Sequence, residues 1–244
     1  MMRRQARARY GTGDFLQLNK RDCGTSIELI PCGADFLKVV WKIGNDNHVF
    51  RASSVMQYQF YSFVLAVYEL YGEGESDAHR TNFGSRKKWR TTRYDRETRK
   101  TTMEHYCVFD GEGVLYQFLL RREFIDDFVP DLAAPDPIGI TIGYPDGTEF
   151  QYTLDGKDLC YAVAKAYTEA LKKYGFYGYF LGTGDDGCCT GDIIPLYMFL
   201  FIKAYALGNM KARELKKIWT DRENGHRAFV SPFEKEMELL LFDM

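Results

Sequence analysis

The chain has 244 residues, of which 45% are hydrophobic, 16% aromatic and 27% charged. It is therefore long enough to bury a substantial core, as one large domain or two small ones. The formal net charge of −2 excludes the general attraction to nucleic acids and anionic membranes that a strongly basic chain shows.

The N-terminal residues 1–14 carry four arginines but no apolar run, so they are not typical of a secretory signal. We expect this segment to be a mobile basic tail. The longest apolar run, residues 193–207, spans about 15 residues and contains Lys203, whereas a membrane helix needs roughly 20. These features predict a cytoplasmic protein with reduced thiols and no membrane span.

The first regular elements are predicted between residues 26 and 72. Ser26 to Ile30 has strand character and is followed by Pro31. Val39 to Gly72 then has the order strand, turn, strand, helix. The predicted helix, residues 57–71, is apolar nearly all round, which indicates a deeply buried position.

A basic segment follows from His79 to Thr102, where nine Lys and Arg residues face only Asp95 and Glu97, a local charge of +7. Such a mixture of cations and aromatic rings could hold a nucleic acid. It could also form an exposed edge strand whose charged side chains prevent aggregation with other strands. A further alternative is that it binds an acidic protein partner. The candidate partner-binding residues are Arg86, Lys87, Lys88, Trp89, Arg90, Arg93 and Tyr94.

Residues 103–122 predict another hairpin, which turns at Asp110–Gly113 and contributes strands to the same sheet. His105 and Cys107 would share one face of a strand, and a pair of this kind could supply two ligands of a metal site. Because no second pair with ligand spacing exists, the sequence predicts no metal site. Residues 123–137, rich in Asp and Pro, are the predicted linker between two halves of the chain.

The stretch from Ile138 to Leu181 is the clearest local unit, a hairpin followed by a helix. Tyr144–Gly147 predicts the turn, because Pro145 presets φ and Gly147 suits a positive φ. Residues 157–174 have one apolar side, and Gly175 is a suitable helix end. At an offset of one hundred this unit matches the earlier strand-strand-helix segment at five identical positions, which predicts an internal duplication.

Residues 177–192 form the most site-like loop, with Gly182, Gly184 and Gly187 in a literal G-x-G-x-x-G spacing. Two acidic residues stand where a pyrophosphate needs positive potential, which argues against a dinucleotide site. The alternatives are a site for a hard cation or a sharp turn before a helix. The residues concerned are Asp185, Asp186 and Asp192.

Residues 193–207 predict a third core helix, and residues 209–244 predict C-terminal helices, the last launched by the capping box Ser231–Glu234. The predicted fold class is α+β, with a mostly antiparallel sheet built from two pseudo-repeated ββα units and covered by helices, and whether the two halves share one sheet is left open. Residues 15–244 then form a single domain of two related halves, about 15–125 and 137–207.

Three segments resemble, together, uncharacterised bacterial proteins with duplicated strand-strand-helix units, some of which look like immunity proteins of polymorphic toxin systems. The segments are Asp35 to Trp41, Phe109 to Phe118 and Ile193 to Leu196. The resemblance covers about residues 35–207 and implies no catalytic residues.

The sequence favours a non-enzymatic protein that binds another protein, plausibly an acidic one, and it indicates no cofactor. Four histidines and no nucleophile paired with a base argue against an enzyme. Two alternatives stay open: an enzyme with a site near Gly182 to Asp192, and a nucleic-acid-binding protein that uses residues 79–102.

Overall fold

The structure is a computed structural model, and it describes residues 24–32, 36–53, 59–71, 90–125, 136–181, 196–207, 217–220, 227–230 and 233–241. The helices in these ranges are α1 (Gln59–Tyr71), α2 (Gly156–Leu181), α3 (Leu196–Leu207) and α5 (Phe233–Leu241). The strands are β1 (Thr25–Pro31), β2 (Phe36–Ile43), β3 (Asp46–Ser53), β4 (Arg90–Asp95), β5 (Lys100–Asp110), β6 (Leu115–Ile125), β7 (Pro137–Gly143), β8 (Glu149–Asp155), β9 (Lys217–Thr220) and β10 (Arg227–Val230).

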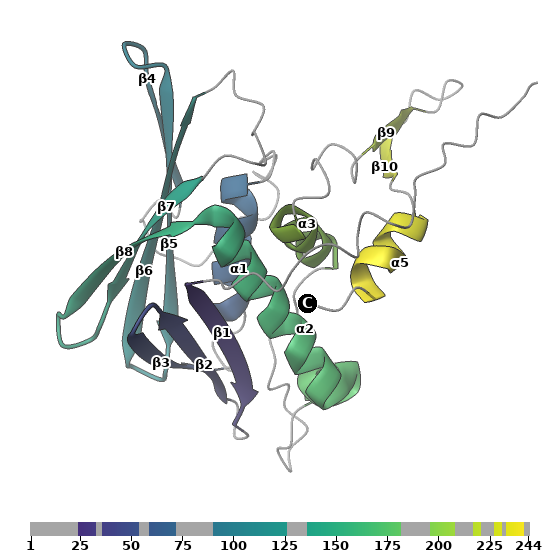
Figure 1. Cartoon of the computed structure of the whole chain (residues 1–244). Coiled ribbons are helices and arrows are strands. Elements are labelled where there is room, and N and C mark those ends of the chain that lie inside the picture. Colours follow the sequence, from purple (N-terminus) through teal and green to yellow (C-terminus); the bar gives the residue numbers. More distant parts are fainter. Residues whose placement is uncertain are drawn as a thin grey trace, which may run out of the picture.

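Two antiparallel sheets dominate the fold, which confirms the predicted α+β class (Figure 1). Strands β1 to β3 form a three-stranded sheet, and β4 to β8 form a five-stranded one, each in simple sequential order. The five-stranded sheet contains strands from both halves of the chain, since β6 pairs with β7 between Gln117 and Arg122.

The strands form two sheets and not a single one, because β3 meets the five-stranded sheet through side chains and not through main-chain pairing. Phe50, fully buried on β3, lies with its ring edge-on to Phe109, Phe118 and Tyr116 of β5 and β6. Packed aromatic rings of this kind bury large areas between sheet faces. The two hairpins therefore stack face to face.

Each long helix crosses to the sheet that its own preceding hairpin does not belong to. Helix α1 follows β2 and β3 but packs mainly on β5, whereas α2 follows β7 and β8 but packs mainly on β1. Helix α3 packs on α2 and α1, on the side away from the five-stranded sheet (Figure 1). It is buried from Met198 to Leu207, as the apolar run predicts, whereas Leu196 at its start is exposed.

The predicted turns are confirmed at both long hairpins of the five-stranded sheet. Gly147 has a φ of +86° and donates its N–H to the Tyr144 carbonyl at 3.0 Å. Gly113 has a φ of +94° and donates to a carboxylate oxygen of Asp110 at 2.8 Å. These positions favour glycine because a Cβ would strain a positive φ.

Helix α2 starts where the sequence predicts, and its helical backbone is interrupted at Gly175, where the sequence predicts a helix end. Asp155 accepts a hydrogen bond from the main-chain N–H of Lys157 at 2.8 Å, as an N-terminal capping residue does. Gly175, with φ 69° and ψ 166°, interrupts the helical backbone, and helix resumes after it as far as Leu181. The regular part ends at the glycine that the sequence indicates.

The prediction of helices over residues 209–244 is wrong in part, since β9 and β10 pair there as an antiparallel hairpin and only α5 is helical. The β-branched and aromatic residues Ile218, Trp219, Phe229 and Val230 favour strands. Residues 1–14 and 126–135 lie outside the described residues. Within the described part of the chain, none of the helices has the length and apolar character needed to cross a bilayer.

Candidate functional site

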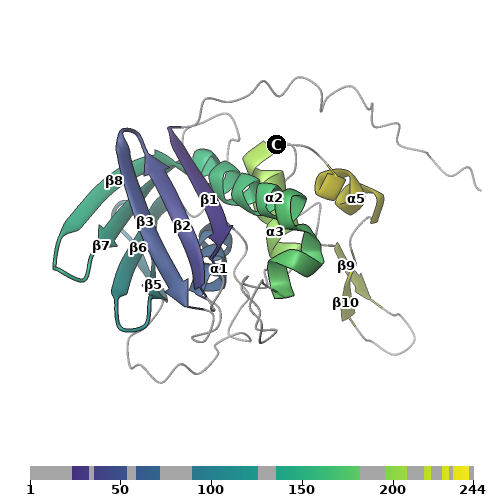
Figure 2. The ribbon, with the colours of Figure 1, turned by 90° about the horizontal axis from the view of Figure 1, so that it is seen from below.

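A groove of about 460 Å³ runs between the edge strand β1 and helix α2. The two elements lie side by side in both views of the fold and pack on each other (Figures 1 and 2). Five consecutive residues, Thr25 to Leu29, line the groove. Because neighbouring side chains of a strand point to opposite faces, a consecutive set means that the edge of the main chain itself forms the wall.

The register of β1 shows which of its main-chain groups face this groove. Gly44 donates its N–H to the Gly24 carbonyl at 2.8 Å, and Cys32 donates to the Phe36 carbonyl at 2.9 Å. The even-numbered residues of β1 therefore form the hydrogen-bonded pairs with β2. The N–H and C=O groups of Thr25, Ile27 and Leu29 point the other way, toward the groove.

Among the described residues, these outward main-chain groups have no main-chain partner. Helix α2 lies opposite, but the main chain of a helix is satisfied internally and cannot continue a sheet. Pro31 closes the free edge on one side, because proline has no N–H to donate. The groove thus presents about 13 Å of strand edge with hydrogen-bonding capacity.

The helix wall combines small buried residues with long exposed ones. Ala162, Ala166 and Ala170 recur every four residues and are at most 3% exposed. Their small side chains let α2 approach β1 closely. Lys165, Glu169 and Lys173 each follow one of these alanines by three residues and also line the groove.

Two lysines and two carboxylates line the groove. The lysines are Lys165 and Lys173 of α2, and the carboxylates are Glu28 and Glu169. Lys42 of β2 lies beside the groove, because it pairs with the lining residue Ser26. The pKa of Lys173 is raised by a hydrogen bond with Tyr174 and further by Glu28, so this lysine and Glu28 lie near each other across the groove. Lys165 instead has its ammonium 5.8 Å from the centre of the Tyr161 ring.

The partner-binding residues predicted from the sequence fall partly on β4, which is the edge strand of the five-stranded sheet. Arg90 lies 3.8 Å from Glu69 of α1, whereas Arg93 lies 3.9 Å from Glu104 on the opposite face of the sheet. Tyr94 is 52% exposed. The structure brings these residues onto one strand but not onto one face, and two of them already have an acidic neighbour.

The remaining predicted site residues lie outside the described residues. These are Arg86, Lys87, Lys88, Trp89, Asp185, Asp186 and Asp192. In the ranges that the structure does describe, no three His, Cys, Asp or Glu side chains gather as metal ligands would. His105 and Cys107 do share the buried face of β5.

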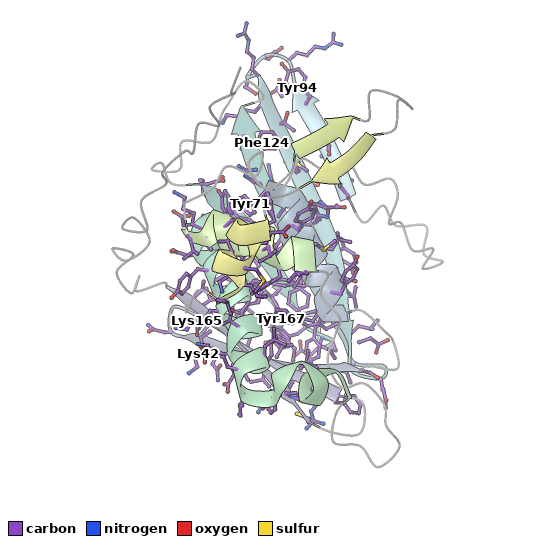
Figure 3. All side chains as sticks on the ribbon, turned by 90° about the vertical axis from the view of Figure 1, so that its right-hand side faces the viewer. Lys42, Tyr71, Tyr94, Phe124, Lys165 and Tyr167 are labelled. Carbon is purple, nitrogen blue, oxygen red and sulfur yellow. The ribbon has the colours of Figure 1, made fainter. Side chains whose placement is uncertain are left out.

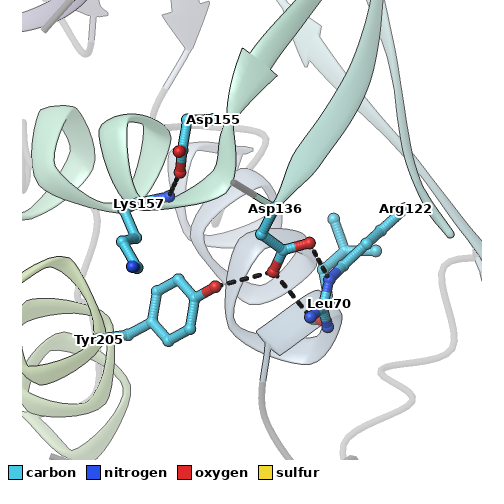
Figure 4. A network of polar contacts seen from close by, with 6 residues as sticks. All are labelled: Leu70, Arg122, Asp136, Asp155, Lys157 and Tyr205. Carbon is cyan, nitrogen blue, oxygen red and sulfur yellow. Dashed lines mark hydrogen bonds and ion pairs between the residues drawn. The ribbon is translucent and has the colours of Figure 1, made fainter. Parts of the chain in front are cut away.

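A buried polar network joins helices α1 and α3 to strand β6 (Figure 4). The sequence did not predict this network. Arg122 donates from Nε and Nη2 to the two carboxylate oxygens of Asp136, at 3.0 and 2.7 Å. Its Nη1 donates to the Leu70 carbonyl at 2.6 Å. Tyr205 of α3 donates to the same carboxylate at 2.8 Å. The Arg122 side chain is only 9% exposed, so these contacts serve to hold α1, β6 and α3 together.

A chain of hydrogen bonds that runs from buried His48 to exposed Asp46 connects the hairpins β2–β3 and β7–β8. Its Nδ1 lies 2.7 Å from the Tyr144 hydroxyl and its Nε2 lies 2.7 Å from that of Tyr152. Tyr152 donates to Asp46 at 2.8 Å, so its oxygen accepts from Nε2–H and Tyr144 donates to Nδ1. Burial lowers the pKa of His48, and the chain fits a neutral imidazole.

His105 is the second buried histidine, with Nε2 at 3.2 Å from Glu69. A carboxylate favours the imidazolium form, but burial outweighs it, and Arg90 approaches the same carboxylate oxygen. Burial and the charge of Arg90 lower the pKa of His105 to about 4. Both histidines are thus neutral, enclosed parts of the scaffold near neutral pH.

The sequence indicated both walls of the groove, a strand before Pro31 and a one-sided helix over residues 157–174. It did not place them together, because about 130 residues separate them along the chain. Pro31 was the available signal, since proline within a strand marks an edge. No family model, curated protein or solved structure matches this chain.

Proposed function

We propose that this protein binds an extended segment of a partner protein in the groove between β1 and α2, where the segment adds a strand to the three-stranded sheet. One observation carries the proposal: the N–H and C=O groups of Thr25, Ile27 and Leu29 line a groove of about 460 Å³ without a main-chain partner among the described residues. Water can satisfy these main-chain groups in the free protein, and an extended peptide can replace that water with the hydrogen bonds of an added strand.

The size of the groove suits a short segment. Residues 25–29 span about 13 Å, so they pair with about five residues of an added strand. Side chains of that strand point alternately to the outer face of the sheet and toward the α2 wall of the groove. The length of the paired segment is limited on one side by Pro31.

This proposal keeps the protein-binding function that the sequence favours and moves its surface. The sequence placed partner binding on the basic segment around β4, whereas the groove lies between β1 and α2. An immunity-like role and a cytoplasmic location stay predictions. So do the two alternatives, an enzyme site near Gly182–Asp192 and nucleic-acid binding by residues 79–102.

We also infer that the two strand-strand-helix units arose by duplication and that their helices cover the sheets. The reciprocal packing supports this, because α1 lies mainly on β5 and α2 mainly on β1, each helix on the sheet of the other unit. Two copies of one unit that exchange helices in this way bury the apolar faces of both.

The test begins with a displayed library of random ten-residue peptides, from which binders are selected on the full-length chain. Each selected peptide is then N-methylated at alternate positions, in two sets. Because a strand uses one edge to pair, one set should lose at least about tenfold in affinity and the other should keep it. Equal affinity of both sets, or a library that yields no binder, would overturn the proposal.

Hydrogen exchange gives a second readout that needs no variant of the protein. In the free chain, the amides of Ile27 and Leu29 should exchange faster than those of Ser26 and Glu28, which donate to β2. A bound peptide should slow the exchange of Ile27 and Leu29. Binding that leaves these two amides unprotected would contradict strand addition.

A further inference from the structure

We propose that the segment bound by the groove carries an acidic side chain, which lies beside Ser26 between Lys42 and Lys165. The inference rests on the proposed function, because it concerns which segment the same groove selects. Ser26 is the exposed residue of β1 that pairs directly with Lys42 of β2. Lys165 lines the groove from the opposite wall, and Figure 3 shows Lys42 and Lys165 on the same side of the molecule.

Neither lysine forms an ion pair in the described part of the chain. Lys165 has an aromatic contact with Tyr161, at 5.8 Å from the ammonium to the ring centre. The two carboxylates that line the groove have other lysines near them: Glu28 acts on Lys173, and Glu169 pairs with Lys172 at 3.5 Å. Lys42 and Lys165 are therefore available to an acidic side chain of the bound segment.

An added strand would place one of its side chains next to Ser26, within reach of Lys42 and Lys165. On the outer face of the sheet, a residue of the added strand opposite Ser26 has its Cβ about 5 Å from that of Ser26. A Glu or Asp there lies next to the Ser26 hydroxyl, which can donate to it. The ammonium groups of Lys42 and Lys165 reach it from either side on four-carbon stems.

Two lysines and two carboxylates line the groove, and Lys42, which pairs with Ser26, adds one positive charge beside it. The lining residues are Lys165, Lys173, Glu28 and Glu169. The chain as a whole has a net charge of −2, so this local excess is opposite in sign to the rest of the protein. Complementary charge of this kind selects partners and speeds their association.

The decisive experiment uses three versions of one selected ten-residue peptide, with Glu, Gln or Lys at the position opposite Ser26. Their affinities for the full chain are measured by fluorescence polarisation at 50 and 300 mM salt. We expect the Glu peptide to bind about threefold to fivefold more tightly than the Gln peptide at low salt, and the difference to shrink at high salt. The Lys peptide should bind most weakly.

The charge reversals Lys165→Glu and Lys42→Glu should each invert this order, so that the Lys peptide binds best. Lys172→Glu is the matched control, because it makes the same change on α2 outside the groove lining and should keep the preference for Glu. Thermal unfolding shows whether each variant is folded.

The outcomes separate the two proposals. Peptides that bind with the alternate N-methylation pattern but without a charge preference would overturn the acidic-segment inference and leave strand addition standing. An inversion that Lys172→Glu produces equally well would also overturn it, since the effect would then come from the general charge of α2. Failure of all three peptides to bind would overturn both proposals.

Discussion

The ring of Tyr71 stacks on the ring of Tyr205, with 4.6 Å between the centroids and 30° between the planes. Their hydroxyls differ sharply in environment. Tyr205 donates to Asp136 at 2.8 Å, whereas the buried hydroxyl of Tyr71 has no hydrogen-bond partner in the described part of the chain. Burial raises the pKa of Tyr71 well above its ordinary value, so the hydroxyl stays protonated.

This contrast predicts opposite effects of the same substitution at the two positions. Tyr71→Phe removes a buried polar group that makes no hydrogen bond, and should raise the free energy of unfolding by about 1 kcal/mol. Tyr205→Phe removes a donor to a buried carboxylate and should lower it by about 2 kcal/mol. Urea unfolding at pH 7 measures both, and an equal loss for the two variants would contradict the assignment.

The close approach of Tyr71 to Gly156 gives a second prediction. A Cβ built on Gly156 would lie 2.0 Å from the Tyr71 hydroxyl oxygen, and the ring cannot move aside because Arg122 and Tyr205 flank it. Gly156→Ala should therefore lower the free energy of unfolding by about 1–3 kcal/mol. In the matched control Gly139→Ala the nearest atom is 3.7 Å away, and we expect a change below about 0.5 kcal/mol. Similar losses in both variants would contradict the steric explanation.

The buried ion pair of Arg122 and Asp136 gives the third prediction. Arg122→Met leaves the Asp136 carboxylate buried without its cation and should cost about 3–5 kcal/mol of stability. The double variant Arg122→Met with Asp136→Leu should cost less than the single one, because no unpaired charge remains. The comparison is made by chemical unfolding.

Arg121→Met is the control for the ion pair, since Arg121 is exposed and pairs with Glu123 at the surface. Exposed pairs contribute little, so this variant should change stability by less than about 1 kcal/mol. A double variant that is less stable than Arg122→Met alone would contradict the prediction that the unpaired Asp136 carboxylate causes the loss.

The buried histidines predict a loss of stability in mild acid. The pKa of His105 is lowered to about 4 in the folded chain and that of His48 is lowered too, whereas an unfolded histidine titrates near about 6.5. Below about pH 6.5 the unfolded chain binds protons that the folded chain does not, so stability falls as pH falls. Above pH 7 both forms are neutral and this effect vanishes.

For His105 alone, the shift corresponds to about 2 kcal/mol of stability lost between pH 7 and pH 5. His105→Gln should flatten the pH dependence of unfolding over this range. A titration of the His105 ring by NMR checks the cause independently, since the resonance should remain that of a neutral ring at pH 5.5. A ring that titrates near 6.5 would contradict the prediction.

Local chemistry explains why so much of the secondary structure could be predicted. The turn at Tyr144–Gly147, the turn at Asp110–Gly113 and the break at Gly175 each depend on a glycine with positive φ, which is written in the sequence. The alternation of β5 likewise indicates its buried face, on which His105 and Cys107 lie. These features need only neighbours along the chain.

The candidate site could not be predicted in the same way. Its two walls, residues 25–29 and the stripe of α2 that includes Lys165, are far apart in the sequence although they are adjacent in the fold. The basic residues around β4 predicted a partner-binding surface because they are adjacent in sequence. In the structure, Arg90 and Arg93 lie on opposite faces of the sheet. Charge density along a chain does not show which side chains share a surface.

By itself, the sequence determined most strands, most helices and the turns of this protein, because these follow from side-chain period and from the φ preferences of single residues. Only the tertiary structure decided that the hairpins stack as two sheets, that α1 and α2 cross to opposite sheets, and that α2 lies along the free edge of β1. The physical reason is that burial of apolar surface is not directional. Many pairings of the same amphipathic elements bury similar areas, and only the fit of particular side chains, such as Phe50 among the aromatic rings of the facing sheet, selects one.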